Sequence, residues 1–205
     1  MIVQTVSVKL PEPNKKEILR YAKAGNDAGL PLDECICELG VRTGRAAYAY
    51  YDILPDGDEL DLGFAKTKSA DLKKALAGCD KILVFAATVG LQPDRMIAKY
   101  NRISGAKALL MQAIGAERAE SLCDVFCASI SDALKKDGYI LRPRFSPGYG
   151  DLPLALQKDL LAALDAGKLL GITLNDSLLM MPTNSVTAIA GIKKSEPSFA
   201  RRDGD

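Results

Sequence analysis

The chain has 205 residues, a length that suits one domain with a substantial hydrophobic core. Its 27 basic and 26 acidic side chains nearly cancel, so no net field would draw it to nucleic acid or to an anionic membrane. Histidine is absent, which removes the usual general base of a serine or cysteine nucleophile and the commonest metal ligand. We therefore expect no nucleic-acid partner, little ordinary hydrolase chemistry, and no imidazole ligand for a corrin or haem.

No window approaches the roughly 20 apolar residues of a membrane-spanning helix, and the N-terminus lacks a signal-peptide pattern. We expect a cytoplasmic protein with no membrane partner and with its five cysteines reduced. None of them shows the C-x-x-C spacing of a zinc site. Cys123 and Cys127 lie one turn apart on a predicted helix, which favours two buried small side chains over a metal pair. Cys35 and Cys37 should point to different faces of either a helix or a strand.

The first 80 residues predict short strands and helices separated by proline and glycine. In chain order these are a strand over 2–10, a helix over 15–24, a helix over about 31–40, a strand over 46–54 and a helix over 69–78. The Pro-Asp-Gly-Asp turn at 55–58 predicts that the strand over 46–54 pairs with residues 59–64 as a hairpin.

Residues 81–86, Lys-Ile-Leu-Val-Phe-Ala, form a continuous apolar run that is typical of a strand buried on both faces. We expect the central strand of the sheet here. The run leads into a corner of small residues at 87–90. Thr88 and Gly90 at this corner fit either a ligand site at a strand end or a simple tight turn.

The second half of the chain predicts long amphipathic helices around one further strand. Its elements are helices over 93–100 and 106–136, a strand from 139, a helix over 153–166 closed by Gly167, an apolar segment over 169–174, a turn at 175–177 and a weak strand over 188–192. The predicted buried stripe of the long helix, interrupted by Gly115, comprises Leu109, Leu110, Ala113, Ile114, Leu122, Val125, Phe126 and Ile130. We predict one domain over 1–192 with a polar, fraying tail over 193–205, and an α/β (α+β) fold with a mixed or antiparallel central sheet flanked by helices.

The segment Arg144-Phe145-Ser146-Pro147-Gly148-Tyr149 combines the groups needed to hold a small zwitterion. Arg144 offers a planar fork of donors for a carboxylate or phosphate. Pro147 fixes the backbone, and Gly148 lets a ligand approach without a Cβ in the way. Tyr149 supplies an aromatic face for a cation or a ring. The alternative is a tight strand-to-helix turn with Arg144 on the surface.

Four pieces in fixed order extend this motif: R-x-x-P-G-Y at 144–149, a helix with Gln157, G-x-x-L-x-x-S at 171–177 and M-x-P-x-x-S-V at 180–186. Together they resemble the activation (reactivation) domain of cobalamin-dependent methionine synthase, in a short, free-standing form. The resemblance covers residues 80–192 and is vague before them. It implies an activation-domain-like fold that binds S-adenosylmethionine.

The resemblance further implies a role in rescuing methionine synthase whose cobalamin has been oxidised to cob(II)alamin. The methyl group would come from S-adenosylmethionine and the electron from a flavodoxin-like reductant, while the cobalamin stays on the partner protein. Arg144 would hold the ligand carboxylate, backbone around Ser146 and Gly148 would meet its adenosyl part, and Tyr149 would pack beside it. Methylation of a reduced cobalt needs no protein acid or base, so we assign no catalytic residue and expect no turnover by this chain alone.

Two further site residues follow from the same resemblance. Asp124 corresponds to an acidic helical residue that contacts the ligand, with Glu120 one turn earlier as the competing choice. Ser185, in the turn over 182–187 that would form one wall of the site, would bond either to the ligand or only to the turn itself.

The chain departs from the family pattern in two places. Ligand contacts that follow the equivalent of Ile192 have no counterpart here, and the ligand-contacting aspartate of the family's N-terminal part has no identifiable position before residue 60. Two alternatives therefore stay open: a noncatalytic module that docks on a corrinoid protein without S-adenosylmethionine, and a reactivator of another corrinoid methyltransferase.

Overall fold

The computed structural model describes residues 2–25 and 29–195, and its centre is a five-stranded antiparallel sheet. The strands, in spatial order, are β1 (Gln4–Lys9), β2 (Thr43–Asp52), β6 (Lys81–Thr88), β10 (Ser185–Lys194) and β7 (Tyr139–Phe145). β6 lies in the middle and is buried along its whole length after the first residue, as its apolar run predicts. The predicted fold class, a mixed or antiparallel central sheet flanked by helices, is confirmed, and every pairing in this sheet is antiparallel.

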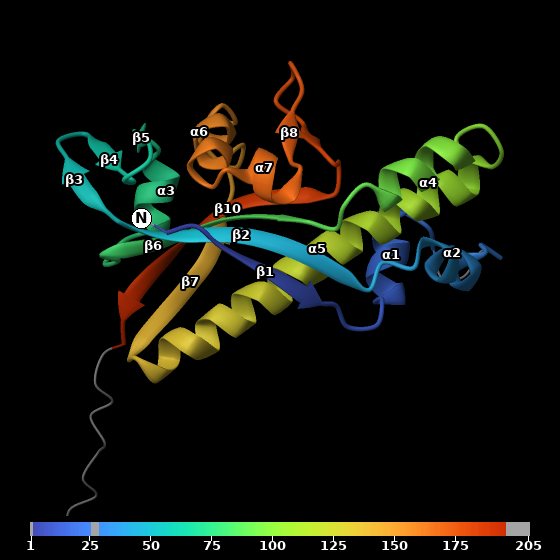
Figure 1. Ribbon diagram of the computed structural model, residues 1–205, viewed down its shortest axis with the longest axis horizontal. Coiled ribbons are helices and arrows are strands. Elements are labelled where there is room, and N and C mark those ends of the chain that lie inside the picture. Colours follow the sequence, from blue (N-terminus) through green and yellow to red (C-terminus); the bar gives the residue numbers. More distant parts are fainter. Residues whose placement is uncertain (1, 26–28, 196–205) are drawn as a thin grey trace, which may run out of the picture.

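Helices cover both faces of this sheet (Figure 1). On one face lies the long helix α5 (Gly105–Lys136), whose Phe126 ring packs at a tilt against the ring of Phe85 in β6, with the ring centroids 5.0 Å apart. The other face is covered by α3 (Ala70–Ala75), α6 (Leu156–Ala163) and α7 (Ala166–Leu170). Leu160 of α6 and Val84 of β6 are both fully buried in that second core. Alternate residues of β6 thus enter two separate cores.

A third core lies beyond the sheet, around the N-terminal half of α5. The helices that form it with α5 are α1 (Lys15–Tyr21), α2 (Leu32–Leu39) and α4 (Gln92–Tyr100). Ile18, Cys35 and Met111 are among its buried side chains, and Cys37 is exposed, which confirms that the two N-terminal cysteines point to different faces. Gly40 ends α2 in the left-handed conformation that glycine adopts without strain.

The predicted hairpin between residues 46–54 and 59–64 is wrong. Strand β2 pairs with β1 on one side and β6 on the other. The Gly-Asp turn at 57–58 instead joins two three-residue strands, which with a third make a separate small sheet: β3 (Leu54–Asp56), β4 (Glu59–Asp61) and β5 (Lys66–Thr67). A turn fixes only the few residues beside it, whereas the buried alanines of β2 pack well only with a neighbour on each side.

The predicted helix over 153–166 is in fact two helices. The chain breaks at Asp165, whose φ is +47°, and α7 then begins at Ala166. Gly167 therefore lies inside α7, and Gly171, with a φ of +73°, ends it. The next segment forms a two-stranded hairpin of β8 (Thr173–Leu174) and β9 (Met180–Met181) around the predicted turn at 175–177.

The buried stripe of α5 and the end of the last strand also differ from the prediction. Leu109 is 44% exposed and does not belong to the buried stripe of α5, because Ala108, Leu110 and Met111 already fill the inward directions. The last strand continues past Ile192 to Lys194, which pairs with Tyr139 of β7. The rest of the predicted tail, from 196 on, lies outside the described residues.

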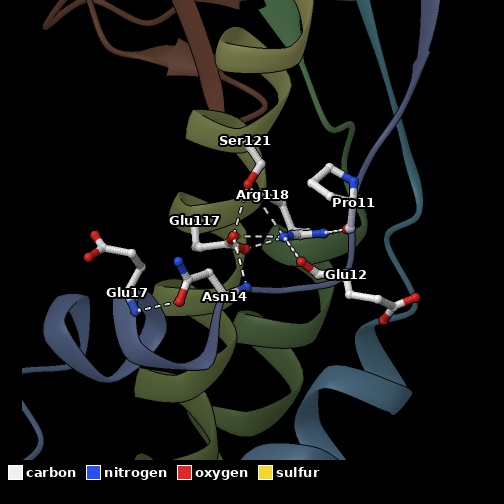
Figure 2. A network of polar contacts seen from close by, with 7 residues as sticks. All are labelled: Pro11, Glu12, Asn14, Glu17, Glu117, Arg118 and Ser121. Carbon is white, nitrogen blue, oxygen red and sulfur yellow. Dashed lines mark hydrogen bonds and ion pairs between the residues drawn. The ribbon is translucent and has the colours of Figure 1, made fainter.

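A buried ion pair fastens the link between β1 and α1 to the middle of α5 (Figure 2). Arg118 and Glu117 are only 1% and 3% exposed, and their closest contact is 2.6 Å. Arg118 also donates to the carbonyl of Pro11 at 2.6 Å, and Glu117 accepts from the amide of Asn14 at 3.1 Å and the hydroxyl of Ser121 at 2.9 Å. Each charge is thus paired and hydrogen-bonded, as buried charges must be.

Candidate functional site

A bulge in the edge strand β7 decides which way Arg144 points. Between the pairs that Leu141 and Arg144 make with β10, two residues of β7 oppose one of β10. Leu141 packs against α5, and Arg144, three positions later, contacts α5 as well, while Phe145 packs on the other face. Simple alternation would place Leu141 and Arg144 on opposite faces. Pro143, which has no amide hydrogen to leave unpaired, lies in the bulge.

Arg144 meets two carboxylates of α5. Its Nη1 donates to Asp124 Oδ1 at 2.7 Å, and its Nη2 donates to Glu120 Oε2. Burial by itself would lower the pKa of Arg144, but the hydrogen bond with Asp124 and the nearby charges raise that pKa above its ordinary value. The three side chains form a fixed cluster with one positive and two negative charges.

This cluster stands at the edge of a pocket of about 550 Å³. Its walls come from the end of β7, the loop into α6, the β8–β9 hairpin and the start of β10. Four of the predicted site residues line it, namely Arg144, Ser146, Tyr149 and Ser185. Glu120 lines it too, whereas Asp124, with a side chain 70% exposed, reaches Arg144 from outside the lining. The position of Glu120 therefore makes it the better placed of the two acids for a ligand in the pocket.

The loop after β7 is folded by its own backbone. The amide of Gly148 donates to the carbonyl of Leu152 at 2.9 Å, and that of Tyr149 donates to Ser146 at 3.2 Å. Gly148 has a φ of +92°, and a Cβ there would meet Leu154 at 3.1 Å, so its glycine serves the turn. Gly148 is not part of the pocket lining, and its backbone contact with the adenosyl part of a ligand stays a prediction. Tyr149 is 69% exposed and stands at the mouth.

Ser185 is 8% exposed, and both hydrogen bonds of its hydroxyl are internal. Its Oγ lies 2.7 Å from the carbonyl of Pro182 and 2.8 Å from Thr88 Oγ1. The hydroxyl therefore joins the turn over 182–187 to the end of β6. This agrees with the alternative in which Ser185 bonds within the protein and not to a ligand. Thr88 and Gly90, considered as a possible ligand corner, do not line the pocket. Thr88 instead supports the wall through Ser185, and its Oγ1 accepts from the amide of Gly90 at 3.1 Å.

Gln157 on α6 was not predicted as a site residue, yet it forms part of the pocket wall. Its side chain is 4% exposed, donates to the carbonyl of Leu178 at 3.1 Å and accepts from Thr187 at 3.2 Å. It thereby joins α6, the β8–β9 hairpin and β10 around one cavity. A polar residue on the apolar face of an amphipathic helix is the signal that could have identified it.

Asp151, also not predicted, anchors the far end of the loop. Its carboxylate accepts from the hydroxyl of Ser69 and from the amides of Ala70 at 2.7 Å and Asp71 at 3.2 Å, at the N-terminus of α3. The hydrogen bond from Ser69 and those from the backbone hold the pKa of Asp151 below its usual value. This contact fixes the loop of the Arg144 motif from its C-terminal side.

The described residues contain no cluster of acids and cysteines with metal-binding geometry, and none of their helices is long and apolar enough to cross a membrane. Cys123 is fully buried beside Arg144, and burial raises its pKa to about 12. Cys127 is half-buried, with its pKa also raised by burial. The described residues bring to this site Arg144, the acids Glu120 and Asp124, and a mainly apolar pocket wall.

Comparison with known proteins identifies the fold. No family model matches the chain, and no curated protein matches it. Among solved structures, the crystal structure of the MetH reactivation domain bound to AdoHcy superposes with a TM-score of 0.66 at 15% sequence identity. The match covers 93% of this chain and 78% of that one, so it extends well beyond residues 80–192. The chain thus has the fold of that reactivation domain.

Proposed function

We propose that this protein, which has the reactivation-domain fold, binds S-adenosylmethionine in the Arg144 pocket and supports reductive methylation of cobalamin on a separate methionine synthase. An external, flavodoxin-like donor supplies one electron to cob(II)alamin. The reduced cobalt then takes the methyl group from the sulfonium, which leaves S-adenosylhomocysteine. The observation that carries this proposal is the charge cluster of Arg144, Glu120 and Asp124 at the pocket edge.

The cluster complements the amino-acid end of such a ligand. Arg144 provides a planar donor fork for the carboxylate, and Glu120 provides an acceptor for the ammonium group. The pocket volume of about 550 Å³ lies within the range of sites that hold small molecules. The positive sulfonium also favours a site in which two carboxylates outnumber one guanidinium.

In this reaction the protein has to position the ligand and does not have to transfer a proton. The reduced metal is itself the nucleophile, so the site has to hold the sulfonium with its methyl group toward the partner. The absence of histidine from the whole sequence is compatible with this role. The exposed Tyr149 at the mouth and the open pocket allow a large cofactor on another protein to approach.

Calorimetric titration with S-adenosylmethionine tests the ligand. We expect saturable binding by the wild type and a loss of about 10- to 150-fold in Arg144→Ala, because a charge-assisted hydrogen-bonding group is worth roughly 1.5–3 kcal/mol. Arg142→Ala is the matched control, since Arg142 lies on the same strand, is exposed and does not line the pocket. Absence of binding by the wild type, or equal weakening by both variants, contradicts the proposal.

A reconstituted assay tests the activity. Methionine synthase that lacks its own activation domain, converted to the cob(II)alamin form, is incubated with reductant and S-adenosylmethionine, with and without this protein. Recovery of methionine synthesis only when this protein and S-adenosylmethionine are both present supports the proposal. Recovery with another corrinoid methyltransferase, and none with methionine synthase, would assign the same chemistry to a different partner.

One observation favours a second candidate function, a noncatalytic module that docks on a corrinoid protein. Arg144 is engaged by two carboxylates of its own chain, so a ligand carboxylate has to compete for it. Under this alternative Arg144→Ala leaves docking on the corrinoid protein intact and the wild type gives no heat with S-adenosylmethionine. A pull-down with the cobalamin-binding fragment of the synthase, run beside the titration, separates the two functions.

A further inference from the structure

One wall of the pocket consists of the short loop between β9 and β10, residues 182–184, and of the first residue of β10. This wall presents Thr183 and Ser185 to the cavity. Thr183 is exposed, so packing alone does not hold it. Its position depends on hydrogen bonds that come from outside the pocket. They join Thr183 to Asp94 on α4, which is distant in the sequence.

Asp94, in the first turn of α4, accepts hydrogen bonds from both donor groups of Thr183. The backbone amide of Thr183 donates to Asp94 Oδ1 at 3.2 Å, and the hydroxyl of Thr183 donates to the same oxygen. Asp94 does not line the pocket. A threonine hydroxyl has one hydrogen and two acceptor lone pairs, so in this arrangement Thr183 Oγ1 can only accept a hydrogen bond from the cavity side.

Helix α4, which carries Asp94, is itself packed into the third core. Pro93 and Met96, on either side of Asp94, are buried, and Met96 and Tyr100 belong to the third core with α1, α2 and α5. The same loop is fitted against α5 from another side, because a Cβ on Gly115 would lie 2.7 Å from the side-chain amide of Asn184. The wall is therefore held by the helical end of the molecule and not by the sheet alone.

We infer that Asp94 is a positioning and specificity-determining residue of the ligand site: it fixes Thr183 as an acceptor-only position, which selects a hydroxyl or amino group of the ligand. This inference rests on the proposed binding of S-adenosylmethionine, whose ribose hydroxyls, exocyclic amine and ammonium group are donors of this class. An acceptor atom of a ligand at the same place would find no proton. The residue acts through Thr183, so its effect on affinity requires the Thr183 hydroxyl.

The test is a double-mutant cycle read by calorimetric titration with S-adenosylmethionine, using Asp94→Ala, Thr183→Val and the double variant. We expect Asp94→Ala to weaken binding about tenfold in the wild-type background and less than twofold in the Thr183→Val background. Asp94→Asn, which keeps one acceptor oxygen for Thr183, should recover most of the affinity. Asp33→Ala is the matched control, because Asp33 also lies in the first turn of a helix in the third core but has no contact with the wall.

Melting temperatures of all variants show whether the fold is retained. Binding by the wild type that is unchanged in Asp94→Ala, or an equal loss in both backgrounds, overturns the inference and leaves the proposed function standing. A melting temperature lowered in Asp94→Ala together with no recovery in Asp94→Asn also overturns it, since the residue would then serve stability only. If the wild type binds no S-adenosylmethionine, the proposed function fails at the first titration, and the inference with it.

Discussion

The buried pair of Glu117 and Arg118 permits a quantitative prediction of stability. Arg118→Met keeps an unbranched apolar stem but removes the guanidinium, so the carboxylate of Glu117 loses its counter-charge at 3% exposure. Among the described residues, only the amide of Asn14 and the hydroxyl of Ser121 still donate to it, and the carbonyl of Pro11 loses its donor. Breaking a buried pair in this way typically costs about 3–5 kcal/mol.

For a chain of this size each kcal/mol lowers the melting temperature by roughly 2–4 °C, so we expect a decrease of about 6–20 °C. Urea unfolding followed by circular dichroism measures the free energy directly. Lys135→Met is the control, since Lys135 pairs with Asp132 on the surface of the same helix at 3.1 Å, and such pairs contribute about 0–1 kcal/mol.

A second variant separates charge burial from packing. Glu117→Leu combined with Arg118→Met removes both charges, and such replacements are often close to neutral, so the double variant should be more stable than Arg118→Met alone. A cost below about 1 kcal/mol for Arg118→Met would show that Glu117 gains water or another partner. A double variant as unstable as the single one would show that the lost bonds to residues 11–14, and not the unpaired charge, set the cost.

Three further predictions concern single residues. Gly115→Ala should destabilise the protein by about 1–3 kcal/mol because the new Cβ overlaps Asn184, whereas Gly105→Ala, with open space at the start of the same helix, should not; urea unfolding of both variants checks this. The pKa of Asp151 is lowered in the folded state, so the stabilising effect of its carboxylate is complete above the ordinary carboxyl pKa of about 4 and is lost as the pH falls through the lowered pKa. The difference in unfolding free energy between the wild type and Asp151→Asn should therefore shrink from pH 7 to pH 3. A difference that stays constant over this range contradicts the assignment. Because burial raises the pKa of Cys123 to about 12 while Cys37 is exposed, iodoacetamide at pH 8 should label Cys37 well before Cys123, and mass spectrometry that finds both labelled at one rate would refute the burial of Cys123.

Much of the fold follows from local patterns in the sequence. The apolar run of β6, the helical periodicity of α5 and the glycine that ends α2 are each recorded in a few adjacent residues, and each prediction is confirmed. The wrong predictions concern which strands pair with each other and where a helix is interrupted. The hairpin at 54–61 is separate from β2. The interruption between α6 and α7 falls at Asp165, where neither a glycine nor a proline would have predicted it.

The candidate site divides in the same way. The sequence by itself determined which side chains are available: the loop of the Arg144 motif, acids one turn apart on a helix and a wall segment before the last strand. It did not determine how these groups meet. The bulge in β7 turns Arg144 toward α5, where Glu120 and Asp124, which precede it by 24 and 20 positions in the sequence, become its partners.

The supports of the site depend on tertiary structure still more. Asp94 meets Thr183 across 89 positions of the chain, and Asp151 meets Ser69 across 82. Periodicity and turn chemistry act over a few residues, because they arise from backbone sterics and nearest hydrogen bonds. Strand order, bulges and helix placement are set by packing of the whole core, and a polar pair between distant segments exists only once that packing is complete.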